Sequence, residues 1–377
     1  MVSDQDKALY LEPCALNLEP FEIMDDFIPT SRLEGDRIVG KPWALRLFYC
    51  QKFSKNCYQG ANMAYTRDAI NINPQKETEQ IVQKLKNDIA NVLKKRGAVV
   101  GVSGGLDSAV VLALCVKALG ANRIYGVIMP EKESSEDSLP LAKKVCELFH
   151  VEYIVEKMTP SLEGFDAYHR RDEAIKKIFP EYDHSYKAKI TLPEDLGKLN
   201  VFYLTIISPG GEQHTKRLPL QAYLKIMAAS NFKQRSRMCM LYFYSESLNY
   251  AVVGTGNKNE QELGFFVKYG DGGVDLKPIV HLLKTQIYQL AEYLDIPQEI
   301  IKRTPTSDTY SAHQTQQEFF YKLPFDILDR IWYGWEKGFS AQDIADALNL
   351  EVNQVEITIN DIERKKRTTD YLRLPPL

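Results

Sequence analysis

The fold of this chain is decided by residues 99–115, VVGVSGGLDSAVVLALC, which predict a strand, a glycine turn and a helix in direct succession. Residues 98–102 are small or β-branched and apolar, a pattern typical of a buried parallel strand. Apolar residues at helical spacing resume at 109–119. A helix that begins after a glycine turn offers free backbone N–H groups and the positive end of its dipole to an anion. We therefore expect an anion-binding turn at residues 103–108.

The turn carries the residue types that such a site needs. Gly104 and Gly105 let the backbone approach an anion closely, and the hydroxyls of Ser103 and Ser108 can donate hydrogen bonds to it. The carboxylate of Asp107 would repel a phosphate unless a divalent cation lies between them, so its presence indicates a metal-bridged site. An ordinary serine-capped turn is the alternative, but the complete SGGLDS string is much less common than such turns.

The turn has neither the GxxxxGK[ST] spacing nor the GxGxxG spacing of other phosphate-binding loops. It resembles instead the pyrophosphate loop of the N-type ATP pyrophosphatases. That resemblance implies cleavage of ATP between the α and β phosphates, with adenylation of a carboxylate or carbonyl oxygen. On this motif alone several branches remain open: NAD synthase, GMP synthetase, asparagine synthetase and tRNA-modifying enzymes.

Length and composition are those of a globular protein with a sizeable core. The chain has 377 residues, of which 44% are hydrophobic and 26% charged. Its net charge of −3 gives no general attraction to nucleic acid or to an anionic membrane, and no apolar run reaches the ~20 residues that span a bilayer. The N-terminus shows no secretory signal, and the six cysteines form no CxxC pair. We expect a cytoplasmic location with reduced thiols.

Strands and helices alternate along the body of the chain. Buried strands are expected at residues 98–102, 123–130, 152–155 and 250–253, and helices at 77–93, 109–119, 139–148 and 223–244. This alternation predicts an α/β fold with a doubly wound parallel sheet, in which ligands bind at the carboxyl ends of the strands. Residues 168–225 interrupt it with two β-rich runs at 187–192 and 201–207, which predict an inserted β-rich element.

Three further regions complete the expected organisation. Residues 1–68 form an N-terminal extension of unclear role (packing or oligomer contact), and residues 69–377 form the main domain, helical from about residue 325. Residues 131–137, EKESSED, are polar and predict a mobile loop. Residues 339–355 have the rhythm of a helix–turn–helix and precede the basic run 364–367, so a DNA-binding regulator is a minor alternative.

A second group of polar residues follows the strand expected at 250–253. The string GTGNKNE at 254–260 contains Thr255 and Glu260, and GFFVKYGDGGVDLKPI at 264–279 contains two aspartates. Lys284 then opens a helix, and Thr306 lies in a later loop. A site for metal-bound phosphate needs such groups, with acids for Mg²⁺ and with lysine and threonine for phosphate oxygens.

With these strings the resemblance narrows to one branch. GTxNKxE, GFFxKYGDGGxDLxPI and PTxD, together with NFKQRSRM at 231–238, are similar to the motifs of the NAD synthase family over roughly residues 70–330. The resemblance implies an adenine nucleotide alpha hydrolase-like, Rossmann-like fold and a homodimer whose second-substrate site includes residues of both subunits. It also implies that deamido-NAD, ATP and ammonia give NAD, AMP and pyrophosphate through an acyl-adenylate, with Mg²⁺ as cofactor.

The resemblance also assigns roles to individual positions. It implies ATP contacts from Ser103, Gly104, Gly105, Asp107, Ser108, Met129, Arg237, Thr255, Lys284 and Thr306. Of these, Asp107, Lys284 and Thr306 would act in catalysis, and Asp107 and Glu260 would hold Mg²⁺. It implies deamido-NAD contacts from Asn231, Arg235, Lys268, Asp271 and Asp275.

Three departures from the family pattern leave the amidated acid open. The usual acidic run after PTxDL is replaced by residues 311–320, SAHQTQQEFF, and both the insertion at 168–225 and the extension at 1–68 are additional. An NAD synthase-like amide ligase for a different carboxylate is therefore the main alternative. No cysteine–histidine pair for nitrogen release from glutamine is evident in the sequence, so free ammonia or a separate glutaminase would supply the nitrogen.

Overall fold

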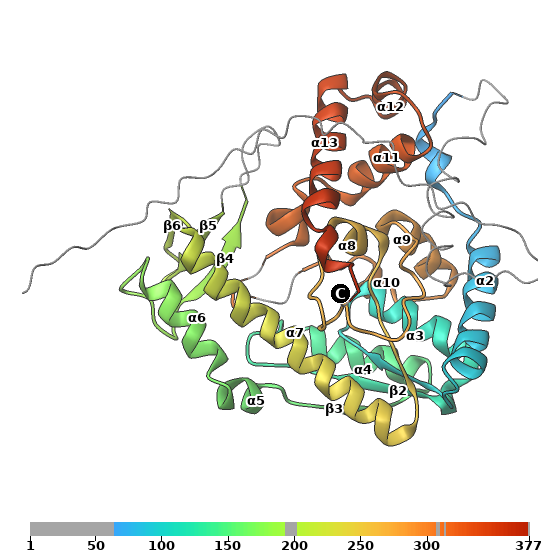
Figure 1. The fold of residues 1–377 in the computed structure, drawn as a ribbon, viewed down its shortest axis with the longest axis horizontal. Helices are drawn as coiled ribbons and strands as arrows, with labels where there is room; N and C mark the ends of the chain where they lie inside the picture. The colour runs from blue at the N-terminus through green and yellow to red at the C-terminus, as the bar shows by residue number, and fades with distance from the viewer. Residues whose placement is uncertain (1–63, 193–201, 307–309, 313, 376–377) are drawn as a thin grey trace, which may run out of the picture. The chain divides into compact units, whose positions relative to one another are not determined.

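Four parallel strands form the central sheet, in the order β3–β2–β1–β7. Figure 1 labels β2 and β3 of this sheet. They are β1 (Ala98–Gly101), β2 (Ile124–Ile128), β3 (Glu152–Val155) and β7 (Ala251–Val253). The computed structural model describes residues 64–192, 202–306, 310–312 and 314–375, so the expected extension at 1–68 lies outside the described residues except for 64–68. Each strand begins and ends within two residues of its expected position.

Alternate side chains of β1 face two separate cores, one on each side of the sheet. Ala98 and Val100 pack in the core that contains α2 (Pro74–Asn87), α3 (Leu106–Leu119), α4 (Ser138–Leu148) and α9 (Lys284–Tyr293). Val99 packs on the other side, with Met238 and Leu241 of the long helix α7 (Leu220–Leu248). Helices therefore cover both faces, which explains why the strand is apolar at every position. The doubly wound α/β fold predicted from the sequence is confirmed.

Short helical elements extend or connect these layers. The α-helical and 3-10 pieces are η1 (Arg67–Ile70), η3 (Ala121–Arg123), α5 (Thr159–Gly164), α8 (Lys258–Leu263), α10 (Gln298–Ile301) and η5 (Asp370–Leu372). Two segments, η2 (Asp88–Val92) and η4 (Gln317–Tyr321), are π-helical. An unbroken α-helix through residue 93 would bury Val92 beside Ile89, but Val92 is 64% exposed because the wider π-turn changes which side chains share a face.

The region expected to be an insertion contains an antiparallel sheet of three strands. These are β4 (Lys187–Thr191), β5 (Tyr203–Ile207) and β6 (Gln213–Arg217). The sheet confirms both β-rich runs and adds β6, whose residues are all exposed and so show no apolar alternation. Helix α6 (Ala167–Lys176) precedes the sheet, and Ile175 of this helix shares a core with Ile190, Ile206 and Ile226.

The C-terminal part is helical, as expected from about residue 325. It contains α11 (Phe325–Glu336), α12 (Ala341–Leu348) and α13 (Val352–Thr368). Within the basic run at 364–367, Lys365 pairs with Asp361 at 2.8 Å and Lys366 pairs with Glu262 at 2.5 Å. These ion pairs within the chain argue against a nucleic-acid surface at α13. No helix in the described part of the chain is long and apolar enough to cross a membrane.

Candidate active site

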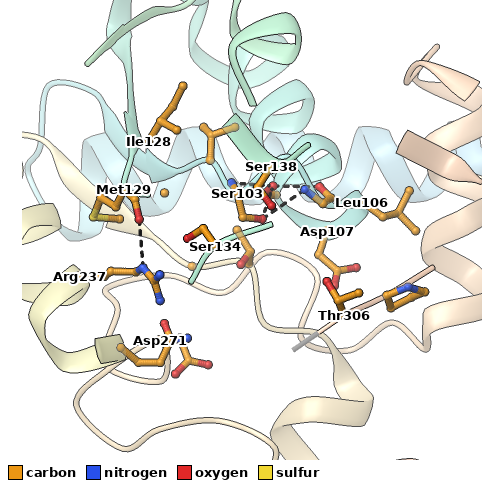
Figure 2. A pocket seen from close by; sticks show the side chains of 18 of the residues that line it. Ser103, Leu106, Asp107, Ile128, Met129, Ser134, Ser138, Arg237, Asp271 and Thr306 are labelled. Atoms are coloured by element: carbon orange, nitrogen blue, oxygen red, sulfur yellow. Dashed lines mark hydrogen bonds between the residues drawn. The ribbon is translucent and has the colours of Figure 1, made fainter. Parts of the chain in front are cut away.

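A cavity of about 280 Å³ opens at the carboxyl ends of β1, β2 and β7 (Figure 2). Its walls come from segments that are far apart in the chain: the SGGLDS turn, the residues after β2, one face of α7, the residues after β7, and residues 303–306. This edge of a doubly wound sheet is where ligands bind in such folds. The cavity therefore lies where the sequence places the anion-binding turn.

The SGGLDS turn connects β1 to α3 and is held by its own hydroxyls. Ser108 Oγ donates to the carbonyl of Gly105 at 2.9 Å, and the Gly105 N–H donates to Ser103 Oγ at 3.3 Å. Gly104 has a φ of +76°, and a Cβ at this position would lie 2.5 Å from the carbonyl oxygen of Ser138. No side chain among the described residues caps the N-terminus of α3, so its first backbone N–H groups remain for an anion.

Asp107 lies at the charged end of the cavity, between a lysine and a second carboxylate. Its Oδ2 accepts hydrogen bonds from Lys284 Nζ at 2.6 Å and from Asn257 Nδ2 at 3.3 Å. Burial and the neighbouring Asp107 raise the pKa of Glu260 to about 8. Burial alone would lower the pKa of Lys284, but Asp107 and Glu260 raise it above its ordinary value. Lys284 is therefore charged at neutral pH.

Asp107 and Glu260 fit a magnesium ion that also binds phosphate. Oδ1 of Asp107 is buried and has no hydrogen-bond partner among the described residues, which leaves a strong acceptor unsatisfied. Burial and the repulsion of the neighbouring Asp107 raise the pKa of Glu260, and a cation bound between the two carboxylates would relieve that repulsion. No group of three or more His, Cys, Asp or Glu in the described ranges could hold a metal. A bound ion would therefore take its remaining ligands from phosphate and water, as Mg²⁺ commonly does.

A buried network behind the cavity fixes the start of α9. The N–H of Lys284 donates to Asn259 Oδ1 at 3.0 Å, and Asn259 Nδ2 donates to Asp329 Oδ1 at 2.5 Å. Oδ2 of Asp329 accepts from the N–H of Thr285 at 2.7 Å and from its hydroxyl at 2.8 Å. Burial raises the pKa of Asp329 to about 6, although these hydrogen bonds oppose the shift. Asp329, which the sequence does not single out, thus connects α11 to the helix that carries Lys284.

The opposite end of the cavity is apolar. Met129, Met238 and Leu241 line it beside Gly101, the last residue of β1. The Nε of Arg237 donates to the Met129 carbonyl at 3.2 Å, so the guanidinium lies at the edge of this apolar wall (Figure 2). An apolar wall at one end and cationic and hydroxyl groups at the other can accommodate a nucleotide, with its base on the apolar wall and its phosphates at the turn.

The cavity brings together most of the side chains predicted for ATP and metal. They are Ser103, Gly105, Asp107, Ser108, Met129, Arg237, Thr255, Glu260, Lys284 and Thr306, and Asp271 from the second-substrate group joins them. Gly104 is the exception, because it does not line the cavity. Its carbonyl accepts from Arg303 at 3.4 Å, and its lack of a side chain makes room for the start of α4.

Four of the five residues predicted for the second substrate lie outside this cavity: Asn231, Arg235, Lys268 and Asp275. Asp275 serves the fold, since its Oδ2 accepts the N–H of Val252 at 2.8 Å and its Oδ1 accepts the Tyr242 hydroxyl at 3.0 Å. Arg235 Nε donates to the Lys268 carbonyl at 3.2 Å. Lys268 Nζ in turn donates to the carbonyl of Leu374 at 3.0 Å. These contacts join α7, the KYGD stretch and the C-terminal residues.

Arg303 and Gln316 are cavity residues that sequence reasoning missed. Arg303 Nη2 donates to Ser135 Oγ at 2.5 Å and to Ser138 Oγ at 3.1 Å, in addition to its bond to the SGGLDS turn. Gln316 donates from Nε2 to the Thr306 carbonyl at 3.5 Å, and its buried Oε1 has no partner in the described residues. The only signal for Arg303 is its place just before the Thr-Pro-Thr string. Gln316 lies in the run that departs from the family pattern, which gave no basis for choosing it.

Comparisons with known proteins show which family the chain is similar to. The family model described as NAD synthase matches residues 77–190 and 182–373. An NH(3)-dependent NAD(+) synthetase from Mesorhizobium japonicum is 43% identical over 303 residues, which cover 80% of this chain and 95% of that protein. Two solved structures share the fold at 23% identity and a TM-score of 0.53. One is the NMN synthetase from Francisella tularensis, whose match covers 81% of this chain and 98% of its own. The other is the NH3-dependent NAD synthetase from Campylobacter jejuni, whose match covers 81% of this chain and 99% of its own.

Proposed function

The chain belongs to the NAD synthase family, and we propose that the cavity between the SGGLDS turn and Lys284 is where it carries out its reaction. It is an ATP-dependent ligase that forms a carbon–nitrogen bond, with ammonia as the nitrogen donor and deamido-NAD as the acid. The relatives do not favour either an amide ligase for another carboxylate or a DNA-binding regulator. One observation carries the assignment of the site: Asp107 of the turn binds Lys284 through Oδ2 and keeps a buried, unsatisfied Oδ1.

In the first step, the carboxylate of deamido-NAD attacks the α-phosphorus of ATP, and the bond to the β-phosphate breaks. The products are an acyl-adenylate and pyrophosphate, so the site must stabilise charge that accumulates on the phosphates. We assign this to the N–H groups at the start of α3, to Lys284, and to the hydroxyls of Thr255 and Thr306. Arg237 and the wall around Met129 would orient the nucleotide so that the α-phosphorus faces the acid.

In the second step, ammonia attacks the acyl carbon, AMP leaves, and one proton is lost from nitrogen. Asp271 lies on the cavity wall, where a carboxylate could accept that proton or hold an ammonium ion before it is deprotonated. We propose free ammonia as the direct donor, supplied either from solution or by a separate glutaminase. We also propose a cytoplasmic location, which suits the free thiols of Cys115, Cys146 and Cys239.

We assign Asp107 and Glu260 as the protein ligands of Mg²⁺. When bound, the ion would neutralise phosphate charge and stabilise pyrophosphate as it leaves. Lys284 donates to Asp107 at 2.6 Å and so compensates part of the carboxylate charge at this place.

We further propose a homodimer in which α7 provides part of the interface. Large apolar side chains are exposed on this helix at Leu220, Leu224, Phe243 and Leu248. Of these, Leu220 and Leu224 lie one turn apart on the same side of α7, and contiguous exposed apolar side chains commonly mark a protein contact. Asn231 and Arg235 lie on the same helix and outside the cavity, as expected if the second-substrate site is completed by a neighbouring subunit.

Product analysis tests this function. The full-length chain is incubated with ATP, Mg²⁺, ammonium and deamido-NAD, and AMP, pyrophosphate and NAD are measured together. We expect the three products in equal amounts. In Asp107→Ala, pyrophosphate release should be abolished while the circular dichroism spectrum is retained. NAD formation at the normal rate by this variant would overturn the site, and the absence of both AMP and NAD in the unmodified protein would overturn the assigned acid.

A further inference from the structure

Two acidic side chains of the loop between β2 and α4 are bound by residues of α6 and α7. Glu131 Oε1 accepts from Lys233 Nζ at 3.0 Å, and Glu131 Oε2 accepts from the hydroxyl of Tyr168 at 2.6 Å. Glu133 Oε2 accepts from Lys233 Nζ at 2.5 Å and from Arg171 Nη1 at 2.6 Å. The sequence EKESSED predicts a mobile loop, whereas the structure anchors both of these glutamates.

This cluster is almost completely removed from solvent. The side chains of Glu131, Lys233, Arg171 and Glu133 are 0%, 3%, 6% and 8% exposed. Burial alone would raise the pKa of Glu133, but Arg171 and Lys233 lower it below its ordinary value, so the acid is charged. Buried ion pairs of this kind add little net stability compared with apolar residues, because desolvation offsets much of their attraction. Stability alone therefore explains the cluster poorly, and its effect on geometry is the better explanation.

The anchored residues lie between two parts of the cavity wall. Met129 and Pro130 line the cavity just before Glu131, and Ser134 and Ser138 line it just after Glu133. The backbone N–H of Glu131 also donates to Ser134 Oγ at 3.1 Å, which ties the two parts together. Any movement of the two glutamates would therefore displace both sides of the wall that we assign to the nucleotide.

Two of the anchoring residues, Tyr168 and Arg171, come from α6, within the region 168–225 that departs from the family pattern. Lys132, between the two glutamates, places its Nζ 3.7 Å from the centroid of the Tyr168 ring. The loop thus meets α6 through three consecutive residues.

We propose that Arg171 and Tyr168 are positioning residues for the ATP site: α6 holds Glu131 and Glu133 so that residues 129–138 are ordered before the nucleotide binds. This rests on the proposed ATP site. Preordering a binding segment increases affinity because less conformational entropy is lost on binding. The region that interrupts the fold would then serve ATP binding and not only the acceptor side of the site.

The test compares Arg171→Met with Arg170→Met, a change at an exposed arginine on the same helix. ATP affinity is measured by calorimetry, kinetic constants by NAD formation, and order in residues 129–138 by amide hydrogen exchange. We expect Arg171→Met to weaken ATP binding and raise KM for ATP by about tenfold, to leave KM for deamido-NAD within twofold, and to speed exchange in 129–138. Arg170→Met should match the unmodified protein. Unchanged ATP affinity with unchanged exchange in Arg171→Met would overturn the proposal.

A double variant separates positioning from stability. Arg171→Met leaves the Glu133 carboxylate with one partner fewer in a buried place, which destabilises the protein by itself. Adding Glu133→Gln removes that charge, so Tm should recover while ATP affinity stays weak and exchange stays fast. Recovery of ATP affinity together with Tm would show a structural role only and overturn the proposal. Tyr168→Phe, which removes one hydroxyl, should also weaken ATP binding, but by less than Arg171→Met does. Because calorimetry and exchange need no turnover, they remain informative if the proposed reaction fails.

Discussion

The ammonium group of Lys284 donates a 2.6 Å hydrogen bond to Oδ2 of Asp107, although the two residues are 177 positions apart in the chain. The bond joins the first turn of α3 to the first residue of α9, and both side chains are nearly buried. The start of each helix thus brings one charged side chain to the same point in the cavity. The other oxygen of Asp107 has no partner in the described residues, so the pair leaves one acceptor directed at a ligand.

Lys284→Met should lower kcat for NAD formation by about 10²–10³-fold, because one group that stabilises phosphate charge is lost. The methionine keeps most of the side-chain volume but leaves Asp107 without its cationic partner, so circular dichroism is measured alongside to show that the variant is folded. Lys302→Met, at an exposed lysine before the cavity segment 303–306, is the matched control and should leave kcat unchanged. Steady-state assays at saturating ATP and deamido-NAD measure the effect. A kcat within twofold of the unmodified protein would remove Lys284 from the mechanism.

Gly104→Ala should destabilise the protein more than Gly211→Ala does. Both glycines have positive φ, at +76° and +88°, so each alanine carries a similar backbone strain of about 1–2 kcal/mol. At Gly104 the new Cβ would also lie 2.5 Å from the Ser138 carbonyl oxygen, whereas at Gly211 no atom lies within 4 Å. Chemical denaturation should therefore show a difference of about 2 kcal/mol or more between the two variants. Equal losses would mean that the turn and α4 can separate without cost.

Arg303→Met should raise KM for ATP more than it lowers kcat, because Arg303 joins the SGGLDS turn to Ser135 and Ser138 in the cavity wall. We expect KM for ATP to rise by about tenfold, because one charge-assisted contact that holds the nucleotide site is lost. Arg303→Lys keeps the charge but cannot span the three acceptors, so it should restore only part of the affinity. Initial rates over a range of ATP concentrations give both constants. Full restoration by lysine would show that charge alone matters at this position.

The pKa of Asp329 predicts a pH-dependent difference between the unmodified protein and Asp329→Asn. Burial raises this pKa from 3.8 to about 6, so the folded protein binds the proton more tightly than the unfolded chain. This stabilisation is fully present below pH 3.8 and is lost as the pH rises through about 6, with a total of about 3 kcal/mol. Asparagine has no such dependence. The Tm of the unmodified protein minus that of the variant should therefore decrease between pH 4 and pH 7. A constant difference over this range would contradict the shift.

The central strand, the turn and α3 could be predicted because each follows a local rule. Val99 and Val100 are both apolar and β-branched, so they predict a buried strand although they face different cores. Two adjacent glycines then indicate the turn. Strand β6 could not be predicted, because all five of its residues are exposed and its pairing partner β5 supplies the register. The π-turn at η2 could not be predicted either, because the sequence continues the apolar spacing of the helix through Val92, which the structure exposes.

Site residues could be predicted where they lie within one short sequence motif. They could not be predicted where the fold brings together residues that are far apart in the sequence. Thr255 and Glu260 follow β7 directly, whereas Asp329 reaches the site only through Asn259 and Thr285. Two of the three departures from the family pattern, residues 168–225 and 311–320, also meet in space. The Ala188 N–H in β4 donates to Ser311 Oγ at 2.9 Å, and Ala312 N–H donates to the Ala188 carbonyl at 3.2 Å. Sequence order gives no sign that they form one structural unit.

The proposed dimer predicts that a charge on the exposed face of α7 separates the subunits. Leu224→Glu, at a side chain that is 56% exposed, should convert a dimer to a monomer in light scattering at micromolar concentration, because a carboxylate buried without a partner is costly. Val92→Glu, at an exposed apolar side chain on another element, should leave the dimer intact. If α7 completes the second-substrate site of the neighbouring subunit, the monomer should bind ATP normally but show a raised KM for deamido-NAD. An unmodified protein that is already monomeric, with full activity, would exclude this arrangement.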